Sequence, residues 1–268
     1  MRKSVFSGLF YPKDSSALKT LISSSFSIQN KFHKKTKAIL APHAGYIYCI
    51  KQLSEAYNAL VNTKFKTAVI IGPSHRHYFK GVSVYSGTSY QIPFGEVSVN
   101  NKEVNELKRL NPIINTVNQA HAQEHSIEVH LPFLHFINPS VNIVPIITGH
   151  NNLKDLQSIS NSILDVVDSE STVFIVSTDF SHFFSSDIAV KMDKLAIDLL
   201  CRQDITELYN QSIKKNIQMC GLDAAIIVWN ILNKLGVRKV EHLSYSHSGQ
   251  ITKDNRSVVG YNSLCAYE

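Results

Sequence analysis

Three apolar runs of the chain are each followed at once by side chains that can bind a metal or move a proton. The runs are residues 38–41, 68–71 and 173–176, and the side chains after them are those of His43, His75, Asp179 and His182. Runs of this kind, rich in β-branched residues, predict buried central strands of a parallel sheet. Because the carboxyl ends of parallel strands lie at one edge, where α/β proteins bind ligands, we expect these side chains to converge.

The residue types at this edge leave two chemistries open. Imidazoles combined with a carboxylate or a thiolate suit a transition metal that keeps an open coordination position. A cluster of histidine and aspartate without a metal could instead perform general acid–base catalysis near neutral pH. Dinucleotide, phosphate-loop and nucleophilic-serine chemistry is disfavoured, because the sequence lacks G-x-G-x-x-G, the G-K-[ST] ending and G-x-S-x-G.

A second polar segment, residues 124–130, carries His125 and Glu128 three positions apart, which places them on one face of a predicted helix. The segment resembles the H-x-x-E-H helix of some metalloproteases but does not match it, because Val129 stands where the second histidine belongs. Pro132 limits or kinks this helix. His125 and Glu128 are therefore either supporting or substrate-facing residues of the same site, or purely structural.

The remaining pattern predicts a single α/β domain over residues 1–268, since no linker divides the chain. A fourth apolar run at 141–147 alternates with segments of helical spacing at 46–61, 101–110, 125–137, 152–167, 187–201 and 220–235. This alternation predicts a three-layer sandwich with a mixed, largely parallel central sheet flanked by helices. Residues 82–85 and 95–99 are expected to form an added antiparallel hairpin, and 239–246 and 257–266 two further strands.

The net charge of +6 originates in the N-terminal segment, because the chain after residue 37 is close to charge balance. The basic residues of that segment are Arg2, Lys3, Lys13, Lys19, Lys31, Lys34, Lys35 and Lys37. No nucleic-acid motif accompanies them, which favours a solvated lysine-rich surface over a nucleic-acid arm. The four cysteines form no C-x-x-C pair, and neither a membrane span nor a signal peptide is present, so we expect a cytoplasmic protein.

Five ordered motifs resemble the Memo family, whose bacterial and archaeal members are called AmmeMemoRadiSam system protein B. They are 41–46 (APHAGY), 72–75 (GPSH), 124–132 (EHSIEVHLP), 177–182 (STDFSH) and 220–221 (CG), and the opening 7–12 (SGLFYP) is similar as well. The likeness runs from about residue 5 to the C-terminus. It implies a fold similar to the LigB-type class III extradiol dioxygenases, which cleave catechol rings with non-haem Fe(II).

The resemblance also implies a ligand set. The two histidines and one cysteine that hold the metal in Memo proteins fall on His43, His75 and Cys220. The extradiol dioxygenases have a glutamate in place of this cysteine, and a soft thiolate favours copper or an altered iron potential. The similarity to the Fe(II) dioxygenases makes Fe(II) the expected metal, and the thiolate makes copper the second candidate.

Further roles follow from the same resemblance. His182 corresponds to the family's acid/base histidine, and Asp179 is expected to set its tautomer as a supporting partner. Tyr46, His125 and Glu128 are expected to line the substrate pocket. Where animal members carry a basic, proline-containing stretch, residues 222–224 read Leu-Asp-Ala, so the rim of the pocket is expected to differ.

Three functions remain open at this level. The first is metal-dependent oxidation or ring cleavage of a small phenolic substrate. The second is a non-catalytic protein that uses a vestigial dioxygenase pocket to capture a peptide or partner domain, and the third is metal storage or delivery. Besides a small-molecule or peptide ligand, family context implies an AMMECR-type protein and a radical-SAM enzyme as partners. From charge and hydropathy we expect neither nucleic acid nor a membrane as a partner.

Overall fold

The computed structural model describes residues 1–26 and 35–268, so Lys31 and Lys34 of the basic segment lie outside the described residues. The strands are β1 Thr36–Ala41, β2 Thr67–Pro73, β3 Val82–Val84, β4 Ser89–Ile92, β5 Gly95–Val99, β6 Ile114–Asn115, β7 Asn142–Thr148, β8 Thr172–Ser177, β9 His182–Phe184, β10 Lys239–His247 and β11 Val258–Tyr267. The helices are α1 Ser15–Ser25, α2 Tyr46–Asn58, α3 Asn101–Leu110, α4 Asn118–Ala122, α5 His125–Glu128, α6 Leu131–Ile137, α7 Leu153–Val166, α8 Ser186–Cys201, α9 Ile205–Ile213, α10 Leu222–Lys234 and α11 Gly249–Thr252.

Four parallel strands form the centre of one mixed sheet, in the order β1-β8-β2-β7. On one side β11 pairs antiparallel with β1, and β10 forms the edge beyond it; on the other side β3 runs antiparallel to β7. The predicted α/β sandwich with a largely parallel sheet is confirmed. The four apolar runs became its four central strands.

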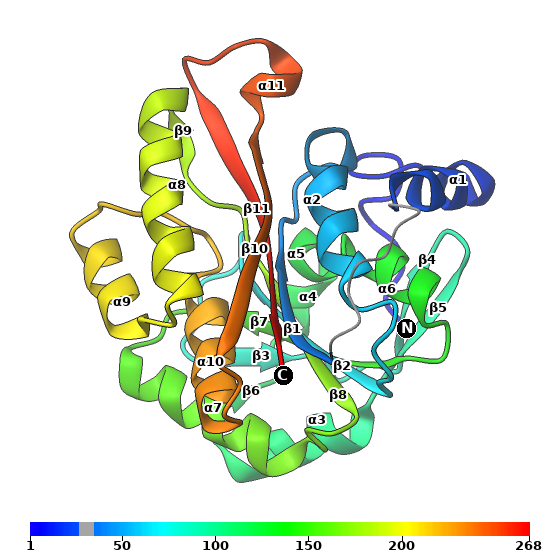
Figure 1. Ribbon diagram of the computed structural model, residues 1–268. Coiled ribbons are helices and arrows are strands. Elements are labelled where there is room, and N and C mark those ends of the chain that lie inside the picture. The colour runs from blue at the N-terminus through cyan, green and yellow to red at the C-terminus, as the bar shows by residue number, and fades with distance from the viewer. Residues whose placement is uncertain (27–34) are drawn as a thin grey trace.

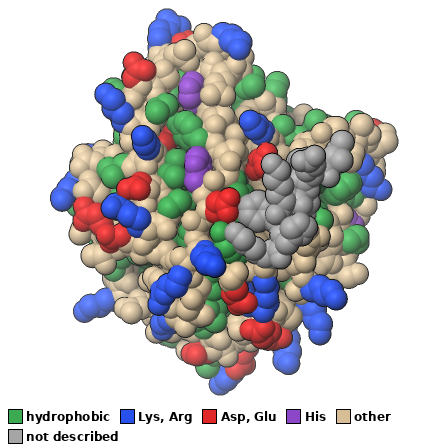
Figure 2. Space-filling model, viewed as in Figure 1, with side chains coloured by type: hydrophobic (Ala, Val, Ile, Leu, Met, Phe, Trp, Pro, Cys, Tyr) green, Lys and Arg blue, Asp and Glu red, His purple; other side chains and the backbone are tan. Residues whose placement is uncertain are grey.

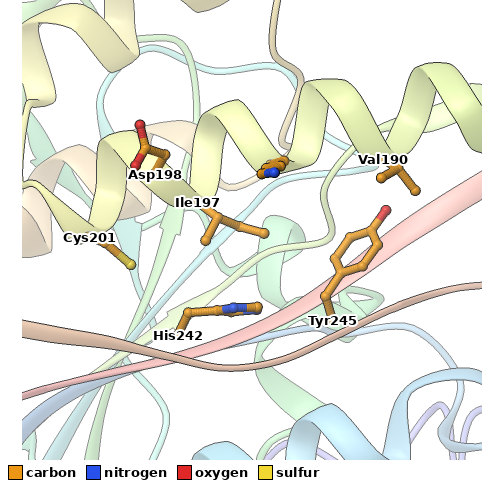
Figure 3. A pocket seen from close by; sticks show the side chains of 7 residues that line it. Val190, Ile197, Asp198, Cys201, His242 and Tyr245 are labelled. Atoms are coloured by element: carbon orange, nitrogen blue, oxygen red, sulfur yellow. The ribbon is translucent and has the colours of Figure 1, made fainter.

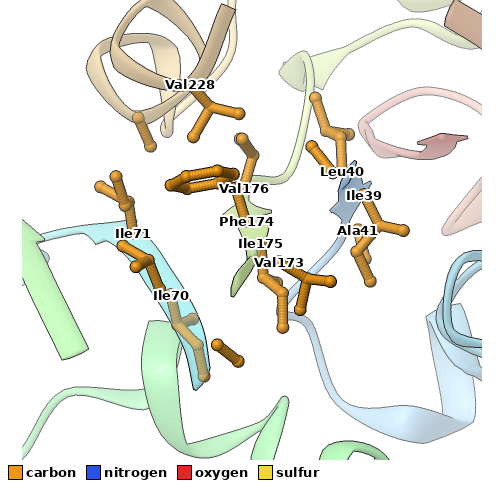
Figure 4. Packing of buried hydrophobic residues seen from close by; sticks show 14 of the residues in the cluster. Ile39, Leu40, Ala41, Ile70, Ile71, Val173, Phe174, Ile175, Val176 and Val228 are labelled. Atoms are coloured by element: carbon orange, nitrogen blue, oxygen red, sulfur yellow. The ribbon is translucent and has the colours of Figure 1, made fainter. Parts of the chain in front are cut away.

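Helices cover both faces of the sheet, with α2 and α6 on one side and α7, α8 and α10 on the other (Figure 1). Every residue of β1, β2 and β8 is buried, as the continuous apolar runs predict for strands covered on both faces. Figure 4 shows their side chains alternating between the two faces, with Val228 of α10 packed against one of them. This packing fixes the positions of the strand ends, which is what a site built there requires.

Two predicted elements are wrong in detail. The hairpin forms between β4 and β5, whereas β3 pairs with β7 and β6, so residues 82–85 belong to the main sheet. The predicted helix over 125–137 is divided into α5 and α6, and Pro132 lies in the first turn of α6, where its missing N–H costs no hydrogen bond.

The prediction of a solvated basic segment fails at two residues. Arg2 is 5% exposed and forms a 2.5 Å ion pair with buried Glu128, and Lys37 of β1 is 2% exposed. On the face shown in Figure 2, Lys and Arg side chains are interspersed with Asp and Glu rather than gathered into a patch. In the described part of the chain, no helix is both long and apolar enough to cross a membrane.

Candidate metal centre

The carboxyl ends of β1 and β2 and the loop before α10 bring three metal-binding side chains together. His43 follows β1 by two residues, His75 follows β2 by two residues, and Cys220 directly precedes the N-cap residue of α10. One ligand atom from each of these residues lies within 4.8 Å of the other two. The strand ends therefore bring His43 and His75 together, and the loop before α10 adds Cys220, the residue that the family resemblance implied.

His43 is held with a defined tautomer. Its ring is buried, and its Nδ1 atom lies 2.7 Å from the hydroxyl of Ser177. That hydroxyl donates its own proton to the Ser126 carbonyl at 2.6 Å, so it accepts a hydrogen bond from Nδ1–H of His43. The Nε2 atom is left as an acceptor and lies 3.3 Å from the Sγ atom of Cys220. Burial, and then the charges of His125 and His75, lower the pKa of His43, which keeps the ring neutral.

His75 is oriented by Glu124, a residue that the sequence interpretation missed. Glu124 is buried and accepts hydrogen bonds from the Nδ1 atom of His75 at 2.8 Å and from its backbone N–H at 2.7 Å. Burial alone would raise the pKa of Glu124, but hydrogen bonds from His125 and His75 outweigh it and hold this pKa well below its ordinary value. An ionised carboxylate on Nδ1 leaves Nε2 of His75 as the free ligand atom, the arrangement common around metal-bound histidines.

His125 joins the other two imidazoles. Its ring stacks on that of His75 with centroids 4.4 Å apart and meets the ring of His43 edge-on at 5.1 Å. The phenyl ring of Phe10 lies 4.8 Å from it on another side. Its Nδ1 atom is 3.2 Å from Glu124, so one carboxylate contacts two of the three histidines. The structure thus places His125 beside His43 and His75, and its contact with substrate stays a prediction.

Cys220 reaches the sheet edge through reciprocal bonds with the segment after β8. Its N–H donates to the Asp179 carbonyl at 3.1 Å, and the N–H of Asp179 points at its Sγ atom at 3.2 Å. Gly221 permits this close approach, because a Cβ atom there would lie 2.4 Å from the Ser177 carbonyl oxygen. Desolvation, and next the carboxylate of Asp179, raise the pKa of the Cys220 thiol far above its ordinary value. A thiolate at this position therefore requires a cation bonded to it.

Asp179 contacts the backbone of His43. Its Oδ1 atom accepts a hydrogen bond from the backbone N–H of His43 at 2.9 Å. Burial raises the pKa of this carboxyl to about 7. Asp179 thereby fixes the backbone that carries one candidate ligand. The contact that the structure gives this carboxylate is thus with His43, and its control of the His182 tautomer stays a prediction.

His182 lies at the border of the centre, at the start of β9. It is partly buried, and its backbone N–H donates to Gln218 at 2.9 Å. Burial, and then the charge of His75, lower the pKa of His182. The next residue, Phe183, is a bulge in the pairing with β11, with φ 66° and 76% exposure. Left-handed backbone at a phenylalanine costs about 1–2 kcal/mol, and it turns the ring of Phe183 to within 5.9 Å of the imidazole of His182.

Two residues predicted to line the pocket support the fold instead. Tyr46 is 2% exposed and donates its hydroxyl proton to the Val129 carbonyl at 2.7 Å. Glu128 is fully buried, pairs with Arg2 and accepts the hydroxyl proton of Tyr11 at 2.5 Å. Glu128 therefore anchors the N-terminal segment, whose ring of Phe10 forms a wall beside His125. Both side chains lack the accessible surface that a substrate contact needs.

A polar cavity of about 280 Å³ opens beside Cys220. It is lined by Pro73, Ser74, Thr148, Gly149, His150, Asn151, Cys220, Leu222 and Asp223. Four of these residues follow β7 or end it, so a fourth parallel strand end, after those of β1, β2 and β8, contributes to the same edge. Asp223, in the segment where the rim was expected to differ, accepts a hydrogen bond from Asn151 at 3.0 Å.

The donor set fits a transition metal. Two imidazoles and a thiol form it, and the Nδ1 atom of each imidazole is already engaged. Ligands that share an ion through bonds of about 2.0–2.3 Å lie roughly 3.3–3.8 Å apart. The pair His43 Nε2 and Cys220 Sγ already meets this spacing at 3.3 Å. All three ligand atoms lie within 4.8 Å of one another, and the side chain of His75 is 31% exposed.

Comparison with known proteins identifies the family of this chain. The family model described as Memo-like protein matches residues 2–265. A MEMO1 family protein of Thermoplasma volcanium is 33% identical over 99% of this chain and 98% of its own length. A MEMO1 family protein of Aquifex aeolicus is 34% identical over 97% of both chains, and one of Methanothermobacter thermautotrophicus is 33% identical over 98% of this chain and 99% of its own. The chain therefore belongs to the Memo family.

Proposed function

We propose that this Memo-family protein is a metal-dependent oxidoreductase that binds one non-haem iron ion, with copper the second candidate, through His43, His75 and Cys220. The observation that carries the proposal is the convergence of these three side chains on one strand edge. Two imidazoles and one thiolate leave coordination positions open, which is typical of a reactive rather than a structural metal site. When bound, such an ion would supply dioxygen activation and electron transfer.

The chain's own residues would prepare the reaction. Ser177 and Glu124 hold the two imidazoles with Nε2 available. His182, whose lowered pKa keeps it neutral near pH 7, would accept the proton of a substrate hydroxyl at the border of the centre. The rings of Phe10 and His125, which are in contact at the centre, offer aromatic surface against which an aromatic substrate could pack. These features favour a small phenolic molecule as substrate.

Oxygen consumption tests this proposal. Protein loaded anaerobically with Fe(II) or with copper is supplied with a panel of phenols and catechols, and His182→Ala is compared with His77→Ala, which removes an exposed neighbouring histidine. We expect His182→Ala to lower the turnover rate by about 100-fold or more with unchanged metal content, because that is the usual contribution of a positioned general base. His77→Ala should behave as wild type.

Two outcomes would contradict the proposal. Turnover that survives His182→Ala unchanged would remove the proton-accepting role of that residue. Stable metal binding without oxygen consumption on any substrate of the panel would favour a non-catalytic binding protein.

A further inference from the structure

A second cavity lies away from the candidate metal centre, between α8 and the edge strand β10 (Figure 3). Its volume is about 380 Å³, within the range of pockets that bind small molecules. It is lined by Val190, Lys194, Ile197, Asp198, Cys201, His242 and Tyr245. None of these residues belongs to the metal centre, so the Memo-type site does not account for this cavity.

Helix α8 contributes one continuous stripe of side chains to the cavity. Val190, Lys194, Ile197, Asp198 and Cys201 follow one another at helical spacing, so they share one face of α8. Val190 on this face is 40% exposed. Helix α8 packs on the sheet through other, buried residues such as Ala196 and Leu200, whereas this stripe borders the cavity. The stripe leaves apolar surface that a ligand could cover.

Strand β10 turns two rings toward this helix face by means of a bulge. The pairing with β11 contains one extra residue, Leu243, between His242 and Ser244. In an unbroken strand His242 and Tyr245 would point to opposite faces of the sheet. The extra residue reverses the alternation, so both rings project toward α8, as Figure 3 shows.

Hydrogen bonds hold the walls of the cavity in place. The hydroxyl of Tyr245 donates to buried Asp193 at 2.8 Å, and Asp193 also accepts hydrogen bonds from the backbone and side chain of Ser181. The thiol of Cys201 is hydrogen-bonded to the backbone of His242. Both aromatic walls are therefore tied to neighbouring elements, and a planar ligand could enter a preformed space.

Two charged side chains, Lys194 and Asp198, line the cavity. Asp198 forms an ion pair with Arg202 at 3.0 Å. Lys194 forms no ion pair with any residue that the structure describes. Apolar walls, two aromatic faces and one ammonium group without an ion-pair partner together match an aromatic ring that carries a single negative charge.

We propose that the cavity between α8 and β10 is a binding site for a small aromatic monoanion, such as an aromatic carboxylate. The ring would lie between Ile197 and the aromatic side chains of β10, and the anionic group would meet Lys194. This site does not depend on metal binding or on the proposed oxidation, so its test is independent of both.

Calorimetric titration with 2-naphthoate tests the proposal on the complete chain, with neutral 2-naphthalenemethanol as the matched ligand. We expect 2-naphthoate to bind with a dissociation constant below 1 mM and about three- to tenfold more tightly than the alcohol, a ratio in keeping with one partly exposed charge-assisted contact. Lys194→Met should abolish this preference. Lys191→Met, which removes an exposed lysine of α8 outside the cavity, should retain it.

A filling variant tests the location. Val190→Trp places an indole ring in the mouth of the cavity and should weaken 2-naphthoate binding at least tenfold, whereas Ile188→Trp, at an exposed position of α8 outside the cavity, should not. Circular dichroism and thermal melts establish that each variant is folded. Absence of binding to the wild type, equal binding by wild type and Val190→Trp, or equal loss in Lys194→Met and Lys191→Met would overturn the proposal.

Discussion

The Nε2 atom of His43 lies 3.3 Å from the Sγ atom of Cys220, although 177 positions separate the two residues in the chain. Both residues are held there by the segment after β8: Asp179 accepts the backbone N–H of His43 and of Cys220, through its side chain and its carbonyl respectively. An imidazole acceptor and a thiol fixed at this distance can share a proton or share a cation. The predictions below distinguish the groups that create this arrangement from those that merely support the fold.

Loss of the Ser177 hydroxyl should weaken metal binding without unfolding the protein. Ser177→Ala removes the acceptor for Nδ1–H of His43, so the ring proton is free to move to Nε2, the ligand atom. We expect a loss of metal affinity of about ten- to hundredfold, as is usual when the partner of a metal-bound histidine is removed. Competition with a chromogenic chelator measures it.

The matched control is Ser160→Ala. Ser160 is a buried serine whose hydroxyl contacts main-chain carbonyls of α7 and α10, away from the centre. It should leave the metal affinity unchanged. Equal losses in the Ser160 and Ser177 variants would show that general loosening of the fold, and not the His43 tautomer, controls metal binding.

Substitutions at two nearby glutamates should have different effects: one should weaken metal binding and the other should destabilise the fold. Glu124→Gln replaces a carboxylate that contacts His75 and His125 with an amide, and should lower metal affinity about ten- to hundredfold. Glu128→Gln breaks the buried pair with Arg2 and should lower the free energy of unfolding by about 3 kcal/mol, since removal of one partner leaves a buried charge uncompensated.

Chelator competition and urea unfolding, applied to both glutamate variants, separate the two effects. At a temperature where Glu128→Gln is folded, its metal affinity should match that of the wild type. The distinction is refuted if Glu128→Gln loses as much metal affinity as Glu124→Gln.

Acid should destabilise the protein through buried histidines outside the centre. Burial lowers the pKa of His121 and His130 to about 3, whereas histidine in an unfolded chain titrates near pH 6.5. Between these values only the unfolded chain carries the proton. The free energy of unfolding therefore falls as the pH falls, by about 1.4 kcal/mol per pH unit for each histidine.

The variant His130→Asn tests this linkage. In the wild type the hydroxyl of Tyr57 lies 3.1 Å from Nδ1 of His130. The amide oxygen of the asparagine in the variant can still accept the hydroxyl proton of Tyr57. Urea unfolding between about pH 6 and pH 4 should show a slope reduced by about 1.4 kcal/mol per pH unit relative to wild type. An unchanged slope would mean that His130 is already protonated in the folded protein.

Strand ends explain how much of the centre could be predicted from the sequence. His43, His75 and Asp179 each follow a continuous apolar run, and parallel pairing of β1, β8 and β2 brings those ends to one edge. The same reasoning could not find Cys220, because it precedes a helix and reaches the edge only through backbone bonds with Asp179. Family resemblance supplied that residue.

Residues whose role depends on tertiary packing were assigned less well. Glu124 lies in the motif at 124–132, and its position directly before His125 was the sequence feature that could have identified it as part of the site. Its contact with His75 exists only because α5 packs beside the end of β2. Tyr46 and Glu128 follow the family motif equally well, yet their side chains are buried and bonded to Val129 and to the N-terminal segment.

The local sequence also does not determine which partners the short strands pair with. Residues 82–85 and 95–99 both alternate in the way strands do, and nothing local distinguishes a hairpin between them from pairing with distant β7. The same limit applies to the bulges in β9 and β10, which aim the rings of Phe183 and Tyr245 and depend on register with β11.

Elemental analysis of anaerobically purified protein tests the central claim most directly, with Cys220→Ser compared with Cys201→Ser, which alters a partly buried cysteine outside the centre. The proposed centre predicts about one iron or copper ion per chain in the wild type and in Cys201→Ser, and at most about a tenth of that in Cys220→Ser, because the thiolate is one of three protein ligands. A wild-type protein that carries neither metal and binds neither on reconstitution, or a Cys220→Ser variant with full metal content, would contradict it.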